Sequence, residues 1–554
     1  MYRVGGFDMT VIKGGMIVDG TGRPGFVGDV FVDGDKIIDI IPSPTTAPPN
    51  HSTIAPQYHN TTIPQYDPTT LLDATGCLVT PGFIDAHSHS DAYLILEPDA
   101  PSKVSQGVTT EINGQCGGSI APRYGEARLS SDWAALLGER LTWRSLAEYR
   151  EVLELAKPAI NTVQFIGHNT LRSSVVGYCG RASTDDELRQ MQRLLEQSLD
   201  EGGWGLTTGL IYQPGKYSTP SEVVALAKTA AAKGGYYATH MRSEGDRILE
   251  AIDEVIDLVK ATGIRAEISH LKTSGRKNWH KIDAVLEKIG AAIDDGLLLG
   301  SDRYPYCAAG TDLDVVFPDW AGEGGCPAEV ERLADPATRK RIIEEINASD
   351  RVWSTVMIGG TWHSDNKCFS GKTVAEIINH QTTKPPNRQT ASPGSVICDI
   401  LERDGCKTGA FFFGMSEENL AKIYRCPWIV PGSDASLRAP WGPLGADHPH
   451  PRAYATMPEF YRRLRELGFS CEETIARMTS VPARRFGISG RGVIEKGAFA
   501  DIVVWSEKDF KAKSTYLSPH AFSEGVRLVM VNGTVPYAGG KFTGERGGRF
   551  LEKP

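Results

Sequence analysis

The segment Pro81–Asp91 reads Pro-Gly-Phe-Ile-Asp-Ala-His-Ser-His-Ser-Asp and joins a short apolar run to two histidines. His87 and His89 are two residues apart, and residues with this spacing in an extended chain point to the same side. Both imidazoles are therefore expected to face one site directly after a buried strand. A single histidine usually has a structural or surface role, but a pair at a strand end indicates a metal site.

The middle of the chain repeats this arrangement, in which an apolar run ends in polar residues and a helical pattern follows. This alternation is typical of βα units. Eight units predict a (β/α)8 TIM-like barrel, whose catalytic groups gather at the C-terminal ends of the strands. The eight runs are Gly82–Ala86, Val108–Ile112, Val163–Ile166, Gly205–Thr208, Tyr237–Thr239, Ala266–Ser269, Leu297–Leu299 and Trp428–Pro431.

The interval between the seventh and eighth runs is too long for one helix. We expect an inserted subdomain or lid at about residues 312–345, extending more loosely to Cys426. The metal-dependent barrel that carries it is predicted to span residues 81–490, which makes the fold class α/β.

Short strand patterns separated by tight turns occupy both ends of the chain. Gly14-Gly15 near the start and Asn532-Gly533 near the end are turn signals. We expect residues 1–80 and 491–554 to form one small β-sandwich domain. Within it, residues 42–70 are rich in Pro and Thr, and they predict a surface loop or partly disordered insertion without a catalytic role.

The composition is that of an ordinary globular protein and excludes several classes of function. A net charge of -9 at pH 7, with no basic run, argues against a nucleic-acid partner. No stretch approaches the roughly 20 apolar residues of a membrane span, and the N-terminus lacks the pattern of a signal peptide. The ten cysteines are scattered without a CxxC pair, which is typical of free thiols. These observations favour a cytoplasmic enzyme with no membrane partner, and they leave a homo-oligomer open.

Other metal-binding side chains follow later predicted strands. His240 follows Tyr237-Ala-Thr and His270 follows Ala266-Glu-Ile-Ser, about thirty residues apart as successive βα units require. Asp434 ends the eighth run. Four imidazoles and a carboxylate at one barrel mouth suit zinc. Asp434 could also accept a proton from water, which is the general-base role in metal-assisted hydrolysis.

Together with the β-sandwich domain predicted from the two chain ends, these features resemble those of the amidohydrolase superfamily. Within it, they resemble the N-acyl-D-amino-acid deacylases (D-aminoacylases). The resemblance covers almost the whole chain. It implies zinc-dependent hydrolysis of the amide bond of an N-acyl-D-amino acid to a carboxylate and a free D-amino acid. Besides the histidine pair, the matching segments are Glu111–Gly117, Gly167–Arg172, Gly209–Gly215, Tyr237–Asp246, Ile268–Lys272, Tyr304–Tyr306, Met478–Gly487 and Gly547–Leu551.

The resemblance also implies one tight zinc site and leaves a second, weaker site open. Many dinuclear amidohydrolases bridge their metals with a carboxylated lysine at the end of the fourth strand, but here that strand ends Gly205-Leu-Thr-Thr-Gly209. A cysteine thiolate can supply the negative charge instead and is a favourable zinc ligand. The implied ligands are Cys116, His240 and His270 at the tight site, and His87, His89 and Asp434 at the second position.

The segment Asp447–Arg452, Asp-His-Pro-His-Pro-Arg, resembles the deacylase motif whose arginine binds the α-carboxylate of the substrate. Lys272 and Tyr304 resemble its companions, since an arginine fork, a lysine and a phenol together suit a carboxylate. His448 and His450 are expected to position this loop rather than to bind metal.

Two departures from the family leave the preferred side chain and acyl group open. Additional residues, roughly Arg438–Leu444, border the site, and Gly310 stands where relatives often carry a hydroxyl. A related amidohydrolase redirected to a specialised metabolite therefore remains an alternative. A cyclic-amide hydrolase of the hydantoinase or dihydroorotase type is disfavoured by the missing lysine and by Arg452. A non-catalytic binding protein would be expected to have lost ligands that this chain retains.

Overall fold

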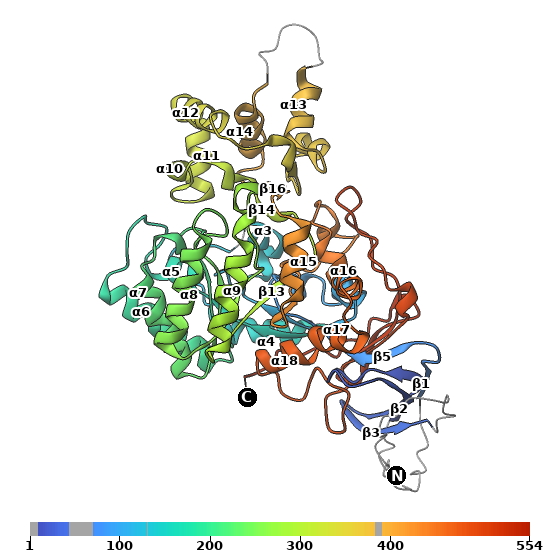
Figure 1. Cartoon of the computed structure of the whole chain (residues 1–554). Coiled ribbons are helices and arrows are strands. Elements are labelled where there is room, and N and C mark those ends of the chain that lie inside the picture. The colour runs from blue at the N-terminus through green and yellow to red at the C-terminus, as the bar shows by residue number, and fades with distance from the viewer. Residues whose placement is uncertain (1–8, 44–69, 130, 383–390, 554) are drawn as a thin grey trace.

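The computed structural model describes residues 9–43, 70–129, 131–382 and 391–553. The predicted insertion at residues 42–70 therefore lies almost entirely outside the described residues. A barrel forms the centre of the molecule, a β-sheet lies at one side, and a group of helices stands above the barrel (Figure 1). In the ranges that the structure describes, no helix is long and apolar enough to cross a membrane.

The predicted (β/α)8 barrel is confirmed, with its third strand split in two at Phe165. The parallel strands pair in two groups, and the barrel closes where Ala86 N donates to Pro431 O at 3.1 Å. In order, the strands are β6 (Phe83–Asp85), β7 (Val108–Asn113), β8 (Asn161–Gln164) with β9 (Ile166–Gly167), β10 (Gly205–Gly209), β11 (Tyr236–His240), β12 (Arg265–Ile268), β13 (Leu299–Arg303) and β17 (Ile429–Pro431).

The seventh strand lies further along the chain than its apolar run predicted. The run Leu297–Leu299 ends where β13 begins, and the strand continues through Ser301, Asp302 and Arg303. All three polar side chains are buried. Apolar character alone therefore misplaces this strand, because buried polar groups take the places that the pattern expects to be apolar.

Amphipathic helices cover the outside of the barrel. α8 (Ile248–Thr262) is representative, because its buried Ile248, Ile252, Val255 and Val259 recur at the spacing of one helical face. The other main covering helices are α5 (His168–Val175), α6 (Asp185–Asp200), α7 (Pro220–Ala232), α9 (Ile282–Asp294), α15 (Glu417–Arg425), α16 (Arg452–Glu466) and α17 (Cys471–Met478).

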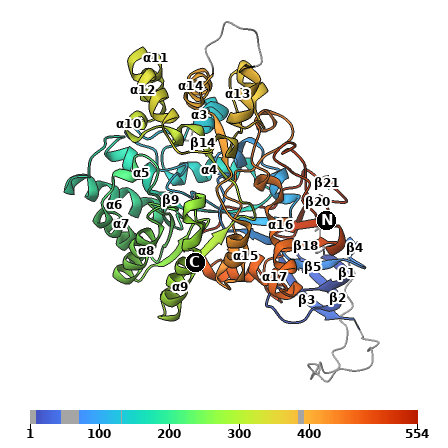
Figure 2. The same ribbon diagram turned by 45° about the horizontal axis from the view of Figure 1, so that its top comes forward.

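Strands from both ends of the chain form the predicted small β domain, where the blue and red ribbons lie side by side (Figure 2). Gly14-Gly15 is not a turn: β1 runs through both glycines with a shift of register between Ile12 and Gly15. Gly14 adopts a φ of 71°, which glycine allows at low cost, so the strand bulges instead of ending. The strands are β1 (Met9–Ile17), β2 (Phe26–Asp33), β3 (Lys36–Pro42), β4 (Thr70–Asp73), β5 (Leu78–Pro81), β18 (Ile502–Trp505), β19 (Val526–Val531), β20 (Thr534–Ala538) and β21 (Lys541–Phe542).

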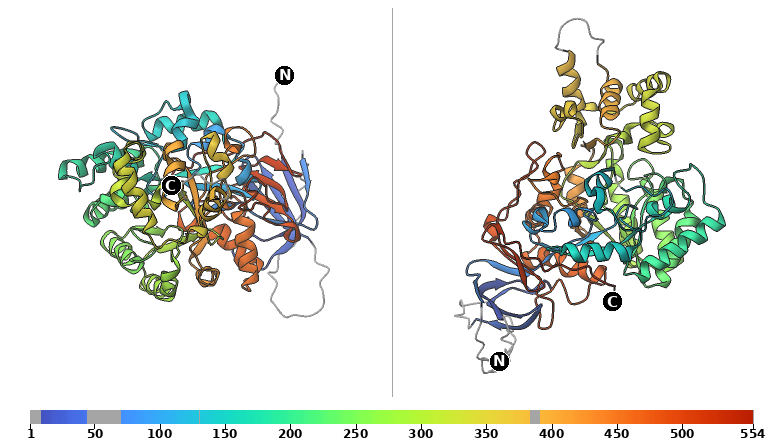
Figure 3. Two further views of the ribbon diagram at one scale, coloured as in Figure 1. Left: turned by 90° about the horizontal axis from the view of Figure 1, so that it is seen from above. Right: turned by 180° about the vertical axis from the view of Figure 1, so that it is seen from behind.

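Residues 309–382 and 391–412, here called the insert, separate β13 from β17 and lie over the barrel (Figure 3). The predicted subdomain, at about 312–345 and extending more loosely to Cys426, overlaps most of the insert. The insert has a separate hydrophobic core, to which α12 and α14 both contribute, so the early helices need the later ones to cover them. Its elements are β14 (Ala309–Asp312), α10 (Asp319–Gly322), α11 (Cys326–Ala334), α12 (Pro336–Asn347), β15 (Val356–Ile358), α13 (Val374–Thr382), α14 (Pro393–Arg403) and β16 (Gly409–Phe412).

Candidate metal centre

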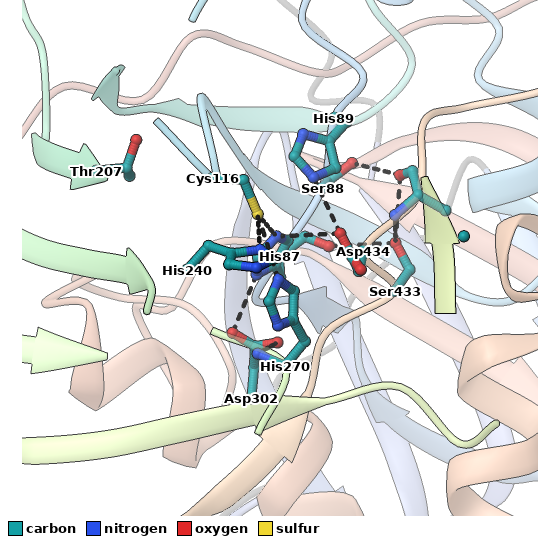
Figure 4. Close-up of polar contacts among 12 residues, drawn as sticks. His87, Ser88, His89, Cys116, Thr207, His240, His270, Asp302, Ser433 and Asp434 are labelled. Atoms are coloured by element: carbon teal, nitrogen blue, oxygen red, sulfur yellow. Dashed lines mark hydrogen bonds and ion pairs between the residues drawn. The ribbon is translucent and has the colours of Figure 1, made fainter. Parts of the chain in front are cut away.

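The six side chains predicted as metal ligands converge at the C-terminal ends of the barrel strands (Figure 4). They come from five places: the loop after β6, the loop after β7, the end of β11, and the segments after β12 and β17. Their donor atoms form two groups, and within each group every donor lies within 4.8 Å of the others. The groups are His87, His89, Cys116 and Asp434, and Cys116, His240 and His270.

Cys116 belongs to both groups and has three imidazoles around its sulfur. Its Sγ lies 3.4 Å from His87 Nε2, 3.4 Å from His270 Nε2 and 3.8 Å from His240 Nδ1. Tetrahedral zinc, with bonds of ~2.3 Å to sulfur and ~2.0 Å to nitrogen, places such atoms about 3.5 Å apart. The donor types and their spacing therefore fit zinc.

Backbone strain is concentrated in the same place. Cys116, His270 and Asp434 have φ values of 52°, 37° and 49°, a region that non-glycine residues seldom occupy. Each such residue costs on the order of 1–3 kcal/mol and persists only where its surroundings fix it. Three of the six candidate ligands are thus held in strained conformations, a pattern typical of functional sites.

The end of the fourth barrel strand is shaped to admit the Cys116 loop. A Cβ built on Gly209 would lie 2.1 Å from the backbone oxygen of Cys116. That distance is far below any real contact, so only glycine allows the loop to reach this point. The thiol thus enters the barrel mouth through space that a side chain from β10 would otherwise fill.

Two anionic groups of the centre are stabilised as anions by their neighbours. Burial opposes ionisation of the Cys116 thiol, but the charges of His87 and His270 outweigh it and hold the pKa well below its ordinary value. Burial likewise opposes ionisation of Asp434, yet Arg452 and His270 hold the pKa of that carboxyl well below its usual range. Both anions are available to a cation.

Two buried carboxylates orient the imidazoles, and the sequence pattern predicted neither of them. Asp302 Oδ2 lies 3.1 Å from His87 Nδ1, and its Oδ1 accepts from His270 N at 3.0 Å. Glu244 Oε1 lies 2.9 Å from His270 Nδ1 and also accepts from Lys272 Nζ. Carboxylates behind ligand histidines fix their orientation and tautomer. The only available signal was the place of Glu244 within the matching segment Tyr237–Asp246.

A buried lysine ties the segment after β17 to β6. Lys103 Nζ donates to Asp85 Oδ2 at 2.7 Å and to Ser433 Oγ at 3.0 Å, and Ser433 N donates to Asp85 Oδ1 at 2.7 Å. In addition, Asp434 N donates to His87 O at 2.8 Å. Asp434 is therefore placed against His87 by a network that is itself fully buried.

The three residues predicted to bind a carboxylate lie beside the metal-binding groups. Arg452 Nη1 donates to Asp434 Oδ2 at 2.7 Å, and its guanidinium lies 4.7 Å from the ring centroid of Tyr304. Lys272 lies against His270 and Glu244. Tyr304 is fully buried, and its hydroxyl has no hydrogen-bond partner among the described residues. Burial opposes ionisation of this phenol, but Lys272 and the nearby arginines outweigh it and lower the pKa.

Neither His448 nor His450 is among the grouped metal donors. His450 Nδ1 accepts from Arg452 N at 3.0 Å while its Nε2 donates to Ala308 O at 3.1 Å. His448 Nε2 donates to Tyr516 O at 2.6 Å. Both rings therefore fix the loop that carries Arg452.

The additional residues 438–444 make hydrogen bonds to residues outside the metal-binding groups. Arg438 Nε donates to Asp447 Oδ2 at 3.0 Å, and Trp441 Nε1 donates to Glu97 Oε2 at 2.9 Å. Gly310 accepts from Arg452 Nη2 at 3.1 Å through its carbonyl oxygen. A Cβ on Gly310 would lie 3.4 Å from that Nη2, so a side chain at this position would contact the guanidinium.

Known proteins match almost the whole of this chain. A model of the amidohydrolase family matches residues 70–537. N-acyl-D-glutamate deacylase of Alcaligenes xylosoxydans xylosoxydans is 31% identical over 94% of this chain and 92% of its own length. D-aminoacylase of the same organism is 30% identical over 99% and 98%. The crystal structure of N-acyl-D-glutamate deacylase from Bordetella bronchiseptica, with zinc and a phosphonate that mimics the tetrahedral intermediate, superposes with a TM-score of 0.79 at 29% identity, covering 99% of this chain and 100% of that one.

Proposed function

The chain belongs to the amidohydrolase family, and from that premise we propose that it hydrolyses N-acyl-D-amino acids to a carboxylate and a free D-amino acid. The observation that carries the proposal is the placement of the Cys116 thiol among three imidazoles, beside a fourth strand that ends in Gly209. The named relatives act on N-acyl-D-glutamate and related compounds, and the preference for D-amino acids is taken from them.

Cys116, His240 and His270 are the proposed ligands of a tight zinc site, and His87, His89 and Asp434 those of a second, weaker one. The donors suit zinc because they combine a thiolate with neutral imidazoles. Zinc bound there would act as a Lewis acid towards the acyl carbonyl and would lower the pKa of water towards ~7.

Asp434 is proposed to move the proton. It accepts a proton from water as the water oxygen bonds to the acyl carbon, and it returns that proton to the amine nitrogen as the C–N bond breaks. One water is consumed for each amide. The carboxylate is well placed for this role because His89 Nε2 lies 3.1 Å from Oδ1 and Arg452 holds Oδ2.

Arg452, Lys272 and Tyr304 are proposed to hold the α-carboxylate of the substrate. The free hydroxyl of Tyr304 is a buried donor that a carboxylate oxygen would satisfy. Arg452 would exchange one hydrogen bond to Asp434 for one to the substrate, which leaves Asp434 less tightly paired when substrate is bound. The amide is thereby oriented towards the metal ligands.

The cellular compartment and the partners of the protein are proposed from its amino-acid composition. All ten cysteines are free thiols, which suits a reducing, cytoplasmic compartment. The net charge of -9 suits a small-molecule substrate better than a nucleic-acid partner. A homo-oligomer stays a prediction that light scattering would test.

The test is release of free amino acid by zinc-loaded protein from N-acetyl derivatives of D- and L-methionine, phenylalanine, aspartate and glutamate. We expect turnover of at least one D-compound and little or none of its L-enantiomer. Failure to release amino acid from any of them, by folded protein with its full complement of zinc, would contradict the proposal.

A further inference from the structure

A second group of metal-binding side chains lies in the insert, away from the barrel site. Asp314 lies in the 3-10 turn η4 (Leu313–Val316), Cys326 begins α11, and Glu329 follows one turn later. One donor atom from each lies within 4.8 Å of the other two. We call these three residues the insert cluster. The i, i+3 spacing places Cys326 and Glu329 on the same face of α11.

A second cysteine lies against the insert cluster. Cys326 Sγ donates to the backbone oxygen of Cys406 at 3.4 Å, and the thiol of Cys406 contacts the Glu329 carboxylate. Cys406 is buried and has a φ of 58°, so a strained residue holds this thiol beside the cluster. A second thiol thus lies beside the insert cluster and contacts one of its carboxylates.

The carboxylates of the insert cluster form no ion pair with any residue that the structure describes, although the charge of Arg332 acts on Glu329 from a greater distance. Glu329 is only 4% exposed. Its Oε2 has no hydrogen-bond partner among the described residues. Arg332, one turn further along α11, donates instead to the backbone oxygens of Ala321 and Glu323. Buried carboxylates without a counter-charge are costly.

The side chains of Asp314 and Glu329 contact each other, so one shared proton could join the two carboxyl groups. Such a proton would not use the thiol of Cys326. A bound cation would instead use one donor atom of each residue of the insert cluster and reverse the local charge balance.

We propose that Asp314, Cys326 and Glu329 bind a structural divalent metal ion of the zinc class, beside the thiol of Cys406. Zinc accepts both carboxylate oxygen and thiolate sulfur as ligands, whereas magnesium and calcium prefer oxygen alone. The ion links η4 to the start of α11, where Cys326 contacts Cys406, 80 residues further along the chain. Asp314 follows β14, whose Gly310 contacts Arg452, so the ion stiffens the insert next to the proposed substrate arginine.

The first test counts metal ions in the whole protein. Protein loaded with Zn²⁺ and desalted would be analysed by elemental mass spectrometry, comparing wild type with Cys326→Ser and with Asp314→Asn/Glu329→Gln. We expect each variant to lose one equivalent of zinc, whereas Cys398→Ser, a buried cysteine of the same insert outside the cluster, loses none. Equal zinc in folded samples of all four proteins would overturn the proposal. The count does not depend on deacylase activity, so it stands apart from the proposed function.

The second test separates the insert cluster from the barrel site by spectroscopy. In a Cys116→Ser background, the thiolate-to-cobalt charge-transfer band of Co²⁺-loaded protein can arise only outside the barrel site. We expect this band to be present, and to disappear when Cys326→Ser is added. Its absence from folded, Co²⁺-saturated Cys116→Ser protein would overturn the proposal even if the insert variants failed to fold.

Discussion

Arg452 Nη1 and Asp434 Oδ2 are joined by a hydrogen bond of 2.7 Å, so the group proposed to bind the substrate holds the group proposed to move the proton. Both side chains are largely buried. A carboxylate held in this way is ionised but weakly basic, because the guanidinium stabilises its charge. When the substrate carboxylate binds, the guanidinium donates hydrogen bonds to two carboxylates instead of one. Substrate binding is thereby coupled to the basicity of Asp434.

Removing the charge of Asp434 should separate metal binding from catalysis. Asp434→Asn keeps the shape of the side chain, so zinc content should stay close to that of wild type while kcat falls by ~10²–10⁴, the usual contribution of a general base. Zinc analysis and steady-state kinetics would measure both. Asp447→Asn, in the nearby loop, serves as the control. Full activity of Asp434→Asn would remove this residue from the proton pathway.

Replacing Arg452 should weaken recognition of the α-carboxylate. Charge-assisted hydrogen bonds contribute about 1.5–3 kcal/mol, so Arg452→Gln should lower kcat/KM for an N-acyl amino acid by roughly 10–150-fold. The matched comparison is an N-acyl amine without the carboxyl group, whose hydrolysis should change much less. Equal losses for both compounds would show that Arg452 acts through Asp434 alone.

Removing the Cys116 sulfur should abolish the tight zinc site. Cys116→Ala should bind substantially less zinc than wild type at equal free zinc, and its activity should fall in parallel, because a thiolate supplies the charge of this ligand set. Cys307→Ala, a half-buried cysteine outside the grouped donors, should behave as wild type. A Cys116→Ala protein with full zinc and full turnover would disprove the ligand assignment.

The Lys103 network should matter for stability more than for the chemistry. Lys103→Met leaves the buried carboxylate of Asp85 without its cation, and loss of one partner of a buried ion pair costs about 3–5 kcal/mol. Urea denaturation would measure the change in the free energy of unfolding. The exposed Lys260→Met on α8 is the control and should lie within about 0.5 kcal/mol of wild type. A similarly small effect at Lys103 would contradict the structural role.

Because of Glu222, the free energy of unfolding should depend on pH in the acidic range. Burial opposes ionisation, but His168 and Arg172 outweigh it and lower the pKa of Glu222 to about 2 from its ordinary 4.5. Because the folded pKa is the lower one, its stabilisation is complete above pH ~4.5 and is lost as pH falls towards ~2. The contribution of ionised Glu222 to the free energy of unfolding is on the order of 3 kcal/mol. The stability difference between wild type and Glu222→Gln should therefore shrink across that window, and a constant difference would contradict it.

The sequence predicts the barrel well because each βα unit repeats the same local signal, an apolar run followed by a helical pattern. It predicts β13 poorly because Asp302 and Arg303 are buried polar residues. The extent of the insert depends on which helices cover one another, which is a property of packing between distant segments.

The candidate ligands were accessible to sequence reasoning because they follow strands at regular intervals. Cys116 required the family resemblance, since a lone cysteine in a glycine-rich loop has no periodic signal. Asp302 and Glu244 were missed because they act on His87 and His270 through space, from other βα units. Their distance along the chain hides that relationship.

The close approach of Gly209 to the Cys116 loop has a chemical consequence. A lysine carried at that strand end must react with carbon dioxide before it can bridge metals, whereas a thiolate needs no such reaction. With the Cys116 loop in place, no side chain fits at Gly209. The proposed centre would therefore depend on reducing conditions rather than on dissolved carbon dioxide, because a thiolate can be oxidised step by step to acids that no longer serve as its original ligand. Peroxide, rather than loss of bicarbonate, is the stress to which such a centre is exposed.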